Sequence, residues 1–267
     1  MAPLDQRRGV RELFSTDAHA YDSRQYGARY RTYIADRQKL VSQVFRDLSL
    51  PEGARVLDIA CGPGYFLLEA VSQGLVAVGM DNSGSMLRTA GARVGKKAFL
   101  VLGDAVALPF PAGTFDAVNC SGLIEYLQEP LALLREIRRV LKPGGRALVS
   151  STNRLSPALA LSPLIDVVRN FEIARRVIRA LRLPFDEMAL RERRFRLTFH
   201  TPAKFAALLR QAGFENTEMH YYHLQLLPHP FDRIAPAAAT ACVTVTDRVL
   251  GVRGLRTFAE GLLAVAG

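Results

Sequence analysis

The chain of 267 residues has only three cysteines, Cys61, Cys120 and Cys242, which lie far apart in the sequence. They form neither a C-x-x-C pair nor the spacing of a metal site. The simplest interpretation is that they are reduced thiols of a cytoplasmic protein. No metal site is predicted.

Long apolar segments are also missing. No run approaches the roughly 20 uninterrupted apolar residues that span a bilayer. The basic residues near the start, Arg7, Arg8 and Arg11, are not followed by the apolar core of a secretory signal. The sequence therefore predicts a cytoplasmic protein, large enough for one sizeable domain with its own core.

Acidic residues are scarce in one segment. The formal net charge is +10, and residues 151–200 hold 10 basic and 5 acidic residues. Between 164 and 183, apolar residues recur at steps of three or four with arginines on the other side, which predicts an amphipathic helix with a basic face. This pattern is typical of a solvated lid. It also suits a lid that receives an anionic or amphiphilic substrate, or that rests on an anionic membrane surface.

What the sequence does contain is a glycine-rich turn within residues 56–70. Strand-prone apolar residues lead to Asp58, the chain turns through Gly62 and Gly64, and helical spacing follows. Glycine lets a ligand approach the backbone closely. A dinucleotide-binding turn would carry a third glycine where Leu67 stands, and Asp58 would repel a phosphate. An acidic residue here favours a ligand with an ammonium or sulfonium group.

The spacing Asp58-x-x-x-Gly62-x-Gly64 resembles motif I of the class I S-adenosylmethionine-dependent methyltransferases. The D-x-S-x-x-M-L segment that begins at Asp81 and the G-D-A segment around Asp104 extend this resemblance. Within the family, the sequence resembles the ubiquinone and menaquinone methyltransferases. The resemblance implies S-adenosyl-L-methionine as the cofactor. It implies cofactor-binding residues at Tyr21, Asp58, Ala60, Gly62, Gly64, Asp81, Asn82, Met86, Asp104, Ala105 and Ser121.

The resemblance also implies roles for some of these residues. Asp81, at the end of a second strand about 20 residues after the glycines, is expected to accept hydrogen bonds from ribose hydroxyls. Asp104 is expected to accept one from the adenine amino group. Tyr21 belongs to an A-x-x-Y-D segment that in relatives precedes the core and folds over the cofactor.

Three residues are candidate catalytic residues. His200, just before a helix that begins at Pro202, is the first choice of general base, although a loop histidine is often only solvated. Glu125 and Tyr126 follow the fourth strand, where many relatives carry Glu-His or His-His. Glu125 is either a site residue or the start of a helix. The tyrosine removes the base that relatives have at that position.

The predicted fold is α/β, a Rossmann-like doubly wound seven-stranded sheet with a terminal antiparallel hairpin and helical cap insertions. Residues 1–50 are expected to form an N-terminal helical cap. Residues 51–267 are expected to form the cofactor-binding domain, with lid insertions at about 153–200 and 224–257.

The predicted activity is methyl transfer to an O, N or C nucleophile of a small or lipid-like molecule, with peripheral contact to a membrane left open. A nucleic-acid methyltransferase is the first alternative, but Asn119-Cys120-Ser121-Gly122 stands where such enzymes carry N/D-P-P-Y/F, so no nucleic-acid partner is expected. A non-catalytic cofactor-binding regulatory protein is the second, because of Tyr126. The oligomeric state is not predicted.

Overall fold

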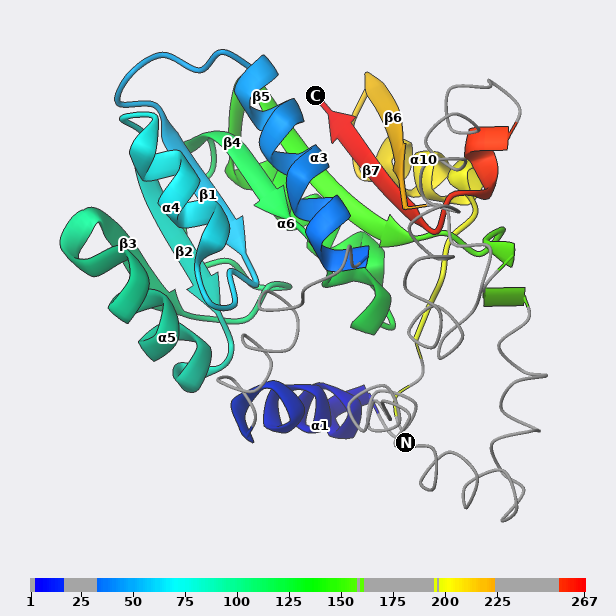
Figure 1. The fold of residues 1–267 in the computed structure, drawn as a ribbon, viewed down its shortest axis with the longest axis horizontal. Helices are drawn as coiled ribbons and strands as arrows, with labels where there is room; N and C mark the ends of the chain where they lie inside the picture. The colour runs from blue at the N-terminus through cyan, green and yellow to red at the C-terminus, as the bar shows by residue number, and fades with distance from the viewer. Residues whose placement is uncertain (1–2, 17–32, 158, 161–194, 196, 224–254) are drawn as a thin grey trace, which may run out of the picture.

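The computed structural model describes residues 3–16, 33–157, 159–160, 195, 197–223 and 255–267, and among them it builds one seven-stranded sheet (Figure 1). The strand order is β3-β2-β1-β4-β5-β7-β6. The first five strands are parallel, and β7 runs antiparallel to both β5 and β6. The predicted fold class is therefore confirmed. The strands are β1 (Arg55–Ile59), β2 (Val76–Asp81), β3 (Ala98–Leu102), β4 (Phe115–Cys120), β5 (Leu141–Thr152), β6 (Thr217–Tyr222) and β7 (Gly261–Ala266).

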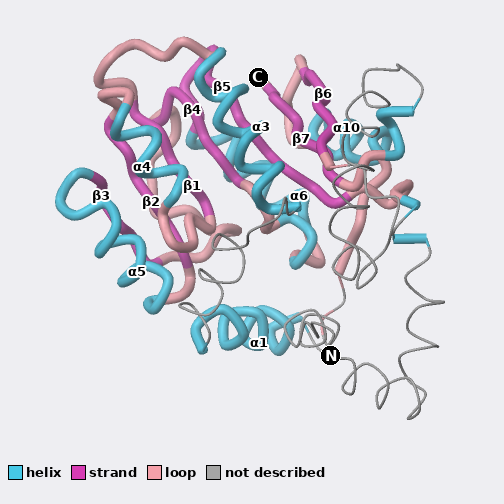
Figure 2. Tube along the Cα trace, in the orientation of Figure 1, coloured by secondary structure: helices cyan, strands magenta, loops and turns pink. Residues whose placement is uncertain are grey.

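Helices cover both faces of this sheet (Figure 2). On one face lie α3 (Tyr33–Asp47), α4 (Tyr65–Ser72) and α5 (Gly84–Val94), and on the other lie α6 (Pro130–Val140) and α10 (Pro202–Gln211). The helix α1 (Pro3–Thr16) lies beyond the carboxyl ends of the central strands (Figure 1). Three short 3₁₀ turns complete the described elements: η1 (Gly95–Lys97), η2 (Ile124–Tyr126) and η3 (Leu255–Phe258).

Alternation along the strands decides which side chains face which helices. Val56 packs with α3 and α4, whereas Leu57 and Ile59 pack with α6 and α10. Successive side chains of a strand point to opposite faces, and a parallel sheet covered on both sides has apolar residues on both. Asp58, two residues after Val56, therefore belongs to the face covered by α3 and α4.

Two helices begin at a capping hydroxyl side chain, Ser83 before α5 and Thr201 before α10. Ser83 Oγ accepts a hydrogen bond from Met86 N at 3.3 Å, and Thr201 Oγ1 accepts one from Lys204 N at 3.3 Å. In contrast, Pro63 precedes α4, which begins at Tyr65. Its N-cap is Gly64, whose φ of 85° is left-handed and therefore favours glycine.

The Lys142-Pro143-Gly144-Gly145 segment leads from α6 into the sheet. It lies within β5, which begins directly after α6, and the pairing of β5 with β4 shifts register opposite Phe115 and Ala117. The positive φ of Gly144, 79°, belongs to this irregular stretch. The reversal is thus an irregular start of the strand rather than a separate loop.

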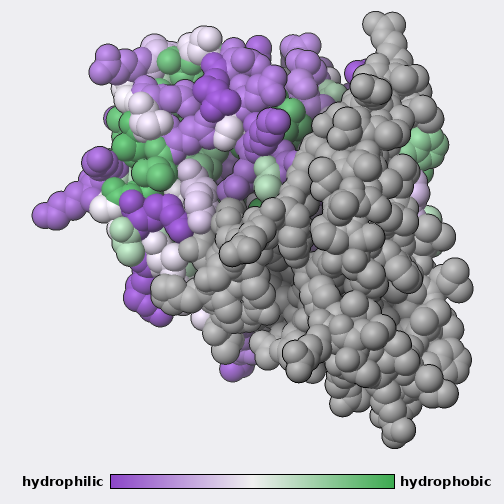
Figure 3. Space-filling model, in the orientation of Figure 1, coloured by the Kyte–Doolittle hydropathy of each residue, from purple (hydrophilic) through white to green (hydrophobic). Residues whose placement is uncertain are grey.

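The predicted division into domains remains a prediction. The helix α3, part of the expected cap, packs Val41, Val44 and Phe45 against the same core as β1 and β5. The expected insertions fall largely outside the described residues, as does the basic helix at 164–183. On the face shown in Figure 3, hydrophilic side chains predominate over the described part, as expected for the outer sides of its covering helices.

Candidate active site

Two carboxylates and a glycine turn meet at the carboxyl ends of β1 and β2. Asp58 is 3% exposed and Asp81 is 7% exposed. Between β1 and α4 the backbone takes positive φ at Ala60 (56°), Gly62 (51°) and Gly64 (85°). Carboxyl ends of parallel strands are where ligands bind to open α/β sheets.

Asp81 holds the glycine turn in place. Its Oδ2 accepts a hydrogen bond from Gly62 N at 2.9 Å, and its Oδ1 accepts one from Ser83 N at 2.9 Å. Burial raises the pKa of Asp81, and these amide donors oppose that rise. Each carboxylate oxygen has further lone pairs, so both oxygens can also accept from a vicinal diol.

Asp58 is the end of a second polar chain. Ser121 Oγ donates to Asn119 Oδ1 at 2.8 Å, and Asn119 Nδ2 donates to Asp58 Oδ1 at 2.7 Å. Burial raises the pKa of Asp58 to about 7, with the nearby Asp81 adding to the rise and Asn119 opposing it. A cation beside Asp58 would therefore be strongly favoured, because it would offset the cost of burying that charge.

The sequence analysis did not predict Asn119 as a site residue. The signal was available, since Asn119 is a polar residue inside an otherwise apolar strand segment, and it lies directly opposite Asp58 in the β1–β4 pairing. Assigning Asn119 to the site requires knowing that β1 and β4 are neighbouring strands.

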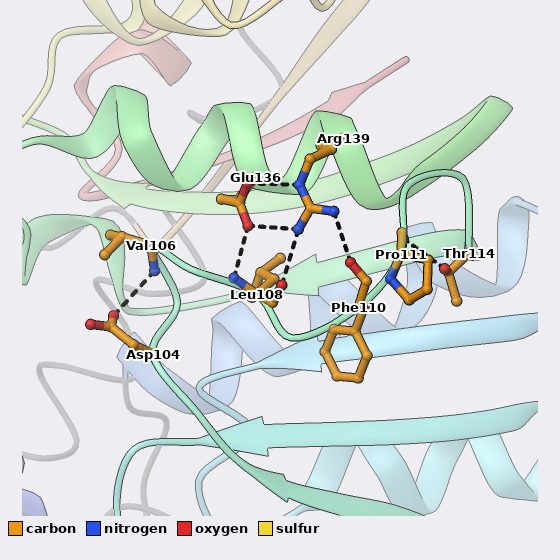
Figure 4. A network of polar contacts seen from close by, with 8 residues as sticks. All are labelled: Asp104, Val106, Leu108, Phe110, Pro111, Thr114, Glu136 and Arg139. Carbon is orange, nitrogen blue, oxygen red and sulfur yellow. Dashed lines mark hydrogen bonds and ion pairs between the residues drawn. The ribbon is translucent and has the colours of Figure 1, made fainter.

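A third acidic residue, Asp104, lies in the loop after β3. It is exposed, and its Oδ1 accepts a hydrogen bond from Val106 N at 3.1 Å, beside Ala105. The loop is fixed further along by α6 (Figure 4). Glu136 Oε2 accepts from Leu108 N at 2.8 Å, while Arg139 donates to Phe110 O at 2.7 Å and to Leu108 O at 3.0 Å.

Of the other expected cofactor residues, Met86 is buried, at 2% exposure, and Asn82 is exposed. Tyr21 lies outside the described residues.

The helix α1 closes over these groups. Near its carboxyl end, Ser15 Oγ donates to Ser83 Oγ at 3.0 Å and Ser15 O accepts from Ser85 Oγ at 2.9 Å. At its other end, Gln6 Nε2 donates to Tyr126 O at 3.2 Å. The helix thus bridges the end of β2 and the turn after β4, so a ligand in the mouth of the sheet lies beneath it.

Of the three candidate catalytic residues, Glu125 and Tyr126 lie at this mouth. Glu125, on η2, is 5% exposed and accepts hydrogen bonds from Thr152 N at 2.8 Å and Thr152 Oγ1 at 3.1 Å. Tyr126 makes an edge-to-face contact with Phe14 of α1, with ring centroids 5.6 Å apart.

His200 lies on the other side of the sheet. It is fully buried, its Nδ1 lies 2.9 Å from Ser151 Oγ, and its ring packs near Phe205 of α10. Because Ser151 and Thr152 are consecutive residues of β5, their side chains point to opposite faces, which separates His200 from Glu125. Burial lowers the pKa of His200 to about 4, so the ring is neutral at pH 7. The structure does not bring His200 together with Asp58, Asp81 and Glu125, and its role as general base stays a prediction.

Two features, a metal-binding cluster and a membrane-spanning helix, are absent from the described residues. In the part of the chain that the structure places, no group of three or more His, Cys, Asp or Glu side chains is arranged to hold a metal ion. None of the helices placed there combines the length and apolarity needed to cross a bilayer.

Comparison with known proteins finds similarity over the central part of the chain. Residues 57–149 match the family described as "Methyltransferase domain". The chain is 32% identical over 160 residues to a demethylmenaquinone methyltransferase of Lactococcus lactis, covering 57% of this chain and 62% of that protein. It is 31% identical over 172 residues to a ubiquinone biosynthesis O-methyltransferase of Xanthomonas axonopodis, covering 62% and 64%. The chain thus spans about three fifths of the length of these relatives.

Among solved structures, the magnesium protoporphyrin IX methyltransferase of Synechocystis superposes with a TM-score of 0.61 at 16% identity, covering 98% of this chain and 99% of that one. At this identity the superposition shows a shared fold. Residues 57–149, which carry the glycine turn and the paired carboxylates, are thus similar to the family described as "Methyltransferase domain", and the strand order is that of the shared fold.

Proposed function

We propose that this protein transfers a methyl group from S-adenosyl-L-methionine to a small-molecule acceptor. One observation carries the proposal: two buried carboxylates, Asp58 and Asp81, flank a glycine turn at the mouth of the sheet. This set of oxygens suits hydroxyl donors and a positively charged group. A pyrophosphate would meet two negative charges there.

The residues present fit that cofactor. Asp81 is placed to accept from the ribose hydroxyls, and the turn at Ala60, Gly62 and Gly64 lets the nucleoside approach the backbone. Asp58, reached through Asn119 and Ser121, provides negative charge for the cationic amino-acid part. The loop at Asp104 and Ala105 would face the adenine, while contacts from Asn82, Met86 and Tyr21 remain predictions.

When bound, the cofactor supplies an electrophilic methyl group on a sulfonium, and the protein's task is to bind, orient and exclude water. Holding two reactants at near-contact distance accounts for about 7–11 kcal/mol of barrier in well-oriented reactions. The helix α1, tied to Ser83 and to Tyr126 O, covers the mouth and supports both the alignment and the exclusion of water.

For the acceptor, we propose a small and lipid-like molecule. The names of relatives that act in menaquinone and ubiquinone biosynthesis support this class. The arginine-rich segment at residues 164–196 supports an amphiphilic acceptor and peripheral contact of a cytoplasmic protein with an anionic membrane surface. That segment lies outside the described residues.

Calorimetric titration with S-adenosylhomocysteine tests the cofactor site. We expect Asp81→Asn to weaken binding by about 10- to 100-fold, because one carboxylate oxygen that accepts from the ribose is replaced by an amide donor. Thermal unfolding of the same variant controls for loss of the Gly62 and Ser83 contacts. Asp47→Asn, an exposed site at the end of α3, is the matched control and should bind as the unaltered protein does. Equal affinity in all three proteins would contradict the assignment.

A further inference from the structure

A third buried carboxylate, Glu125, lies beside the proposed cofactor site, and one of its oxygens has no hydrogen-bond partner among the described residues. Its Oε1 accepts from Thr152 N and from Thr152 Oγ1, but Oε2 is fully buried and accepts no hydrogen bond within the part of the chain that the structure describes. Leaving a buried carboxylate oxygen unpaired is costly, and such groups in native proteins are usually paired. A hydrogen-bond donor brought in from outside the protein is therefore expected at Oε2.

A chain of hydrogen-bonded hydroxyl groups ends at Glu125 Oε1 and leaves Oε2 as the oxygen that can accept another hydrogen bond. Tyr222 Oη donates to Tyr33 Oη at 2.9 Å, Tyr33 Oη lies 3.3 Å from Thr152 Oγ1, and Thr152 Oγ1 donates to Glu125 Oε1 at 3.1 Å. A hydroxyl has one hydrogen, so Tyr33 must be the donor to Thr152. Every donor in the chain points toward the carboxylate, which requires Glu125 to be the acceptor at Oε1.

The surroundings of Glu125 balance its charge. The side chains that face it electrostatically are Arg37 and Tyr33 of α3, Cys120 of β4, Thr152 of β5 and Tyr222 of β6. Burial raises the pKa of Glu125, whereas Arg37 and the Thr152 donors lower it. Burial also raises the pKa of Tyr33, Tyr222 and Cys120, which therefore stay neutral. Burial of Glu125 thus favours proton uptake, while Arg37 and the Thr152 donors favour the carboxylate form.

Glu125 Oε2 lies at the mouth of the sheet, near the proposed cofactor site. Glu125 follows β4 by five residues, and Ser121 and Asn119 of the same segment lead to Asp58. Arg37 crosses the intervening turn directly over Gly122, where any side chain would collide with the guanidinium. Because Oε2 is buried, an acceptor reaches it only after a conformational change that opens a path to it.

We propose that the methyl acceptor is a hydroxyl compound, a phenol or alcohol, and that Glu125 Oε2 accepts the hydrogen of its reacting O–H group. This inference rests on the proposed function. As the O–H bond breaks, its proton passes to Oε2 and the oxygen forms the new bond to the methyl carbon. The carbon–sulfur bond breaks with its electron pair left on sulfur, which becomes a neutral thioether. Thr152 and Tyr33 are positioning residues that hold Oε1 and leave Oε2 free.

The first test measures preference for an O–H group. Calorimetry on the full chain loaded with S-adenosylhomocysteine compares 4-propylphenol with its methyl ether, 4-propylanisole. We expect the phenol to bind about 10-fold more tightly, as for a hydrogen bond to a charged group. In Glu125→Gln the two Thr152 donors hold the amide oxygen at the Oε1 position, so an NH₂ group replaces Oε2. The preference for the phenol should then disappear.

Glu129→Gln, an exposed carboxylate four residues away, is the matched control and should keep the preference. Equal affinities for phenol and ether in the unaltered protein, or no detectable binding of either, would overturn the inference. Failure of S-adenosylhomocysteine to bind would instead overturn the proposed function. Normal binding of that cofactor product without the phenol preference rejects the Glu125 inference alone.

The second test separates positioning from simple packing. Carbon-detected NMR follows the titration of Glu125 in Thr152→Val and Thr152→Ser. Valine removes the hydroxyl donor but keeps the backbone one, so the pKa of Glu125 should rise, and serine should restore it. A Glu125 that titrates in Thr152→Val as in the unaltered protein would show that the hydroxyl chain does not hold the carboxylate.

Discussion

Single acidic residues are buried at the mouth of the sheet, where ionisation of their carboxyl groups costs free energy. Asp58 is the clearest case, because burial raises its pKa to about 7 even though Asn119 donates a hydrogen bond to its Oδ1. A surface position would be less costly for the fold. The cost makes sense when a bound cation compensates it.

Asp58→Asn tests this cost through the pH dependence of stability. In the unfolded chain the carboxyl ionises near pH 4, whereas in the folded protein it stays protonated until about pH 7. The folded state therefore holds more protons in this window, and stability falls as pH rises from about 4 to about 7. Because one pKa unit corresponds to about 1.4 kcal/mol, we expect Asp58→Asn to gain roughly 1–4 kcal/mol relative to the unaltered protein across that range. Urea unfolding at pH 4.5 and pH 7.5 measures the difference. Parallel pH dependences in the two proteins would contradict it.

At the scale of elements, α6 fixes a loop that the sheet alone leaves unsupported. Glu136 and Arg139, one turn apart on α6, form a salt bridge of 2.7 Å and together bind the backbone of Leu108 and Phe110 (Figure 4). This pair lowers the pKa of Glu136 through the Arg139 hydrogen bond. The partly exposed ion pair itself contributes little, and the bonds to backbone groups are what secure the loop that begins at Asp104.

Arg139→Met should loosen this loop without affecting the sheet. We expect a loss of about 1–2 kcal/mol in the free energy of unfolding, since two charge-assisted bonds to carbonyls disappear. Amide exchange at residues 104–110 should become faster, and Arg139→Lys should recover only part of the effect because lysine lacks the planar fork. Arg135→Met, on the exposed side of α6, is the control. Unchanged exchange in the loop would show that the backbone bonds are not what hold it.

At the scale of the whole molecule, α3 connects the segment before β1 to β6 at the edge of the sheet. Asp36 Oδ2 lies 2.8 Å from His223 Nδ1, directly after β6, and Tyr33 meets Tyr222 through their hydroxyl groups. Both side chains of the Asp36–His223 pair are largely buried, 6% and 11% exposed. Since α3 also carries Tyr33 and Arg37, its seating on the sheet decides the surroundings of Glu125.

Asp36→Ala should therefore release α3 locally. Removing Asp36 takes away the carboxylate 2.8 Å from His223 Nδ1 and leaves Glu260 Oε2 at 3.9 Å from Nε2, and we expect a local loss of about 2–4 kcal/mol. Hydrogen exchange should quicken throughout α3 while β1, β4 and β5 remain protected, and methyl transfer should fall with the fold intact. Asp47→Asn at the exposed end of the same helix should change neither property. Global unfolding, or protection of α3 equal to that of the unaltered protein, would contradict this account.

Short-range patterns in the sequence were enough to predict the strands of the sheet and the position of the glycine turn. Asp58, Gly62, Gly64 and Asp81 act through strand ends and turns that lie within a few residues of each of them, so short-range patterns suffice to place them. The same holds for the helix start at Ser83. Such features depend on local backbone conformation, which adjacent residues control.

The contacts around Glu125 could be seen only in the tertiary structure. Glu125 and Thr152 are 27 residues apart, and Tyr33 and Tyr222 are 189 apart, so their contacts depend on strand order and on the seating of α3. The separation of His200 from Glu125 follows from a difference of one residue along β5. Because side chains alternate across a sheet, a single step decides the face, and no local pattern in this sequence marked it.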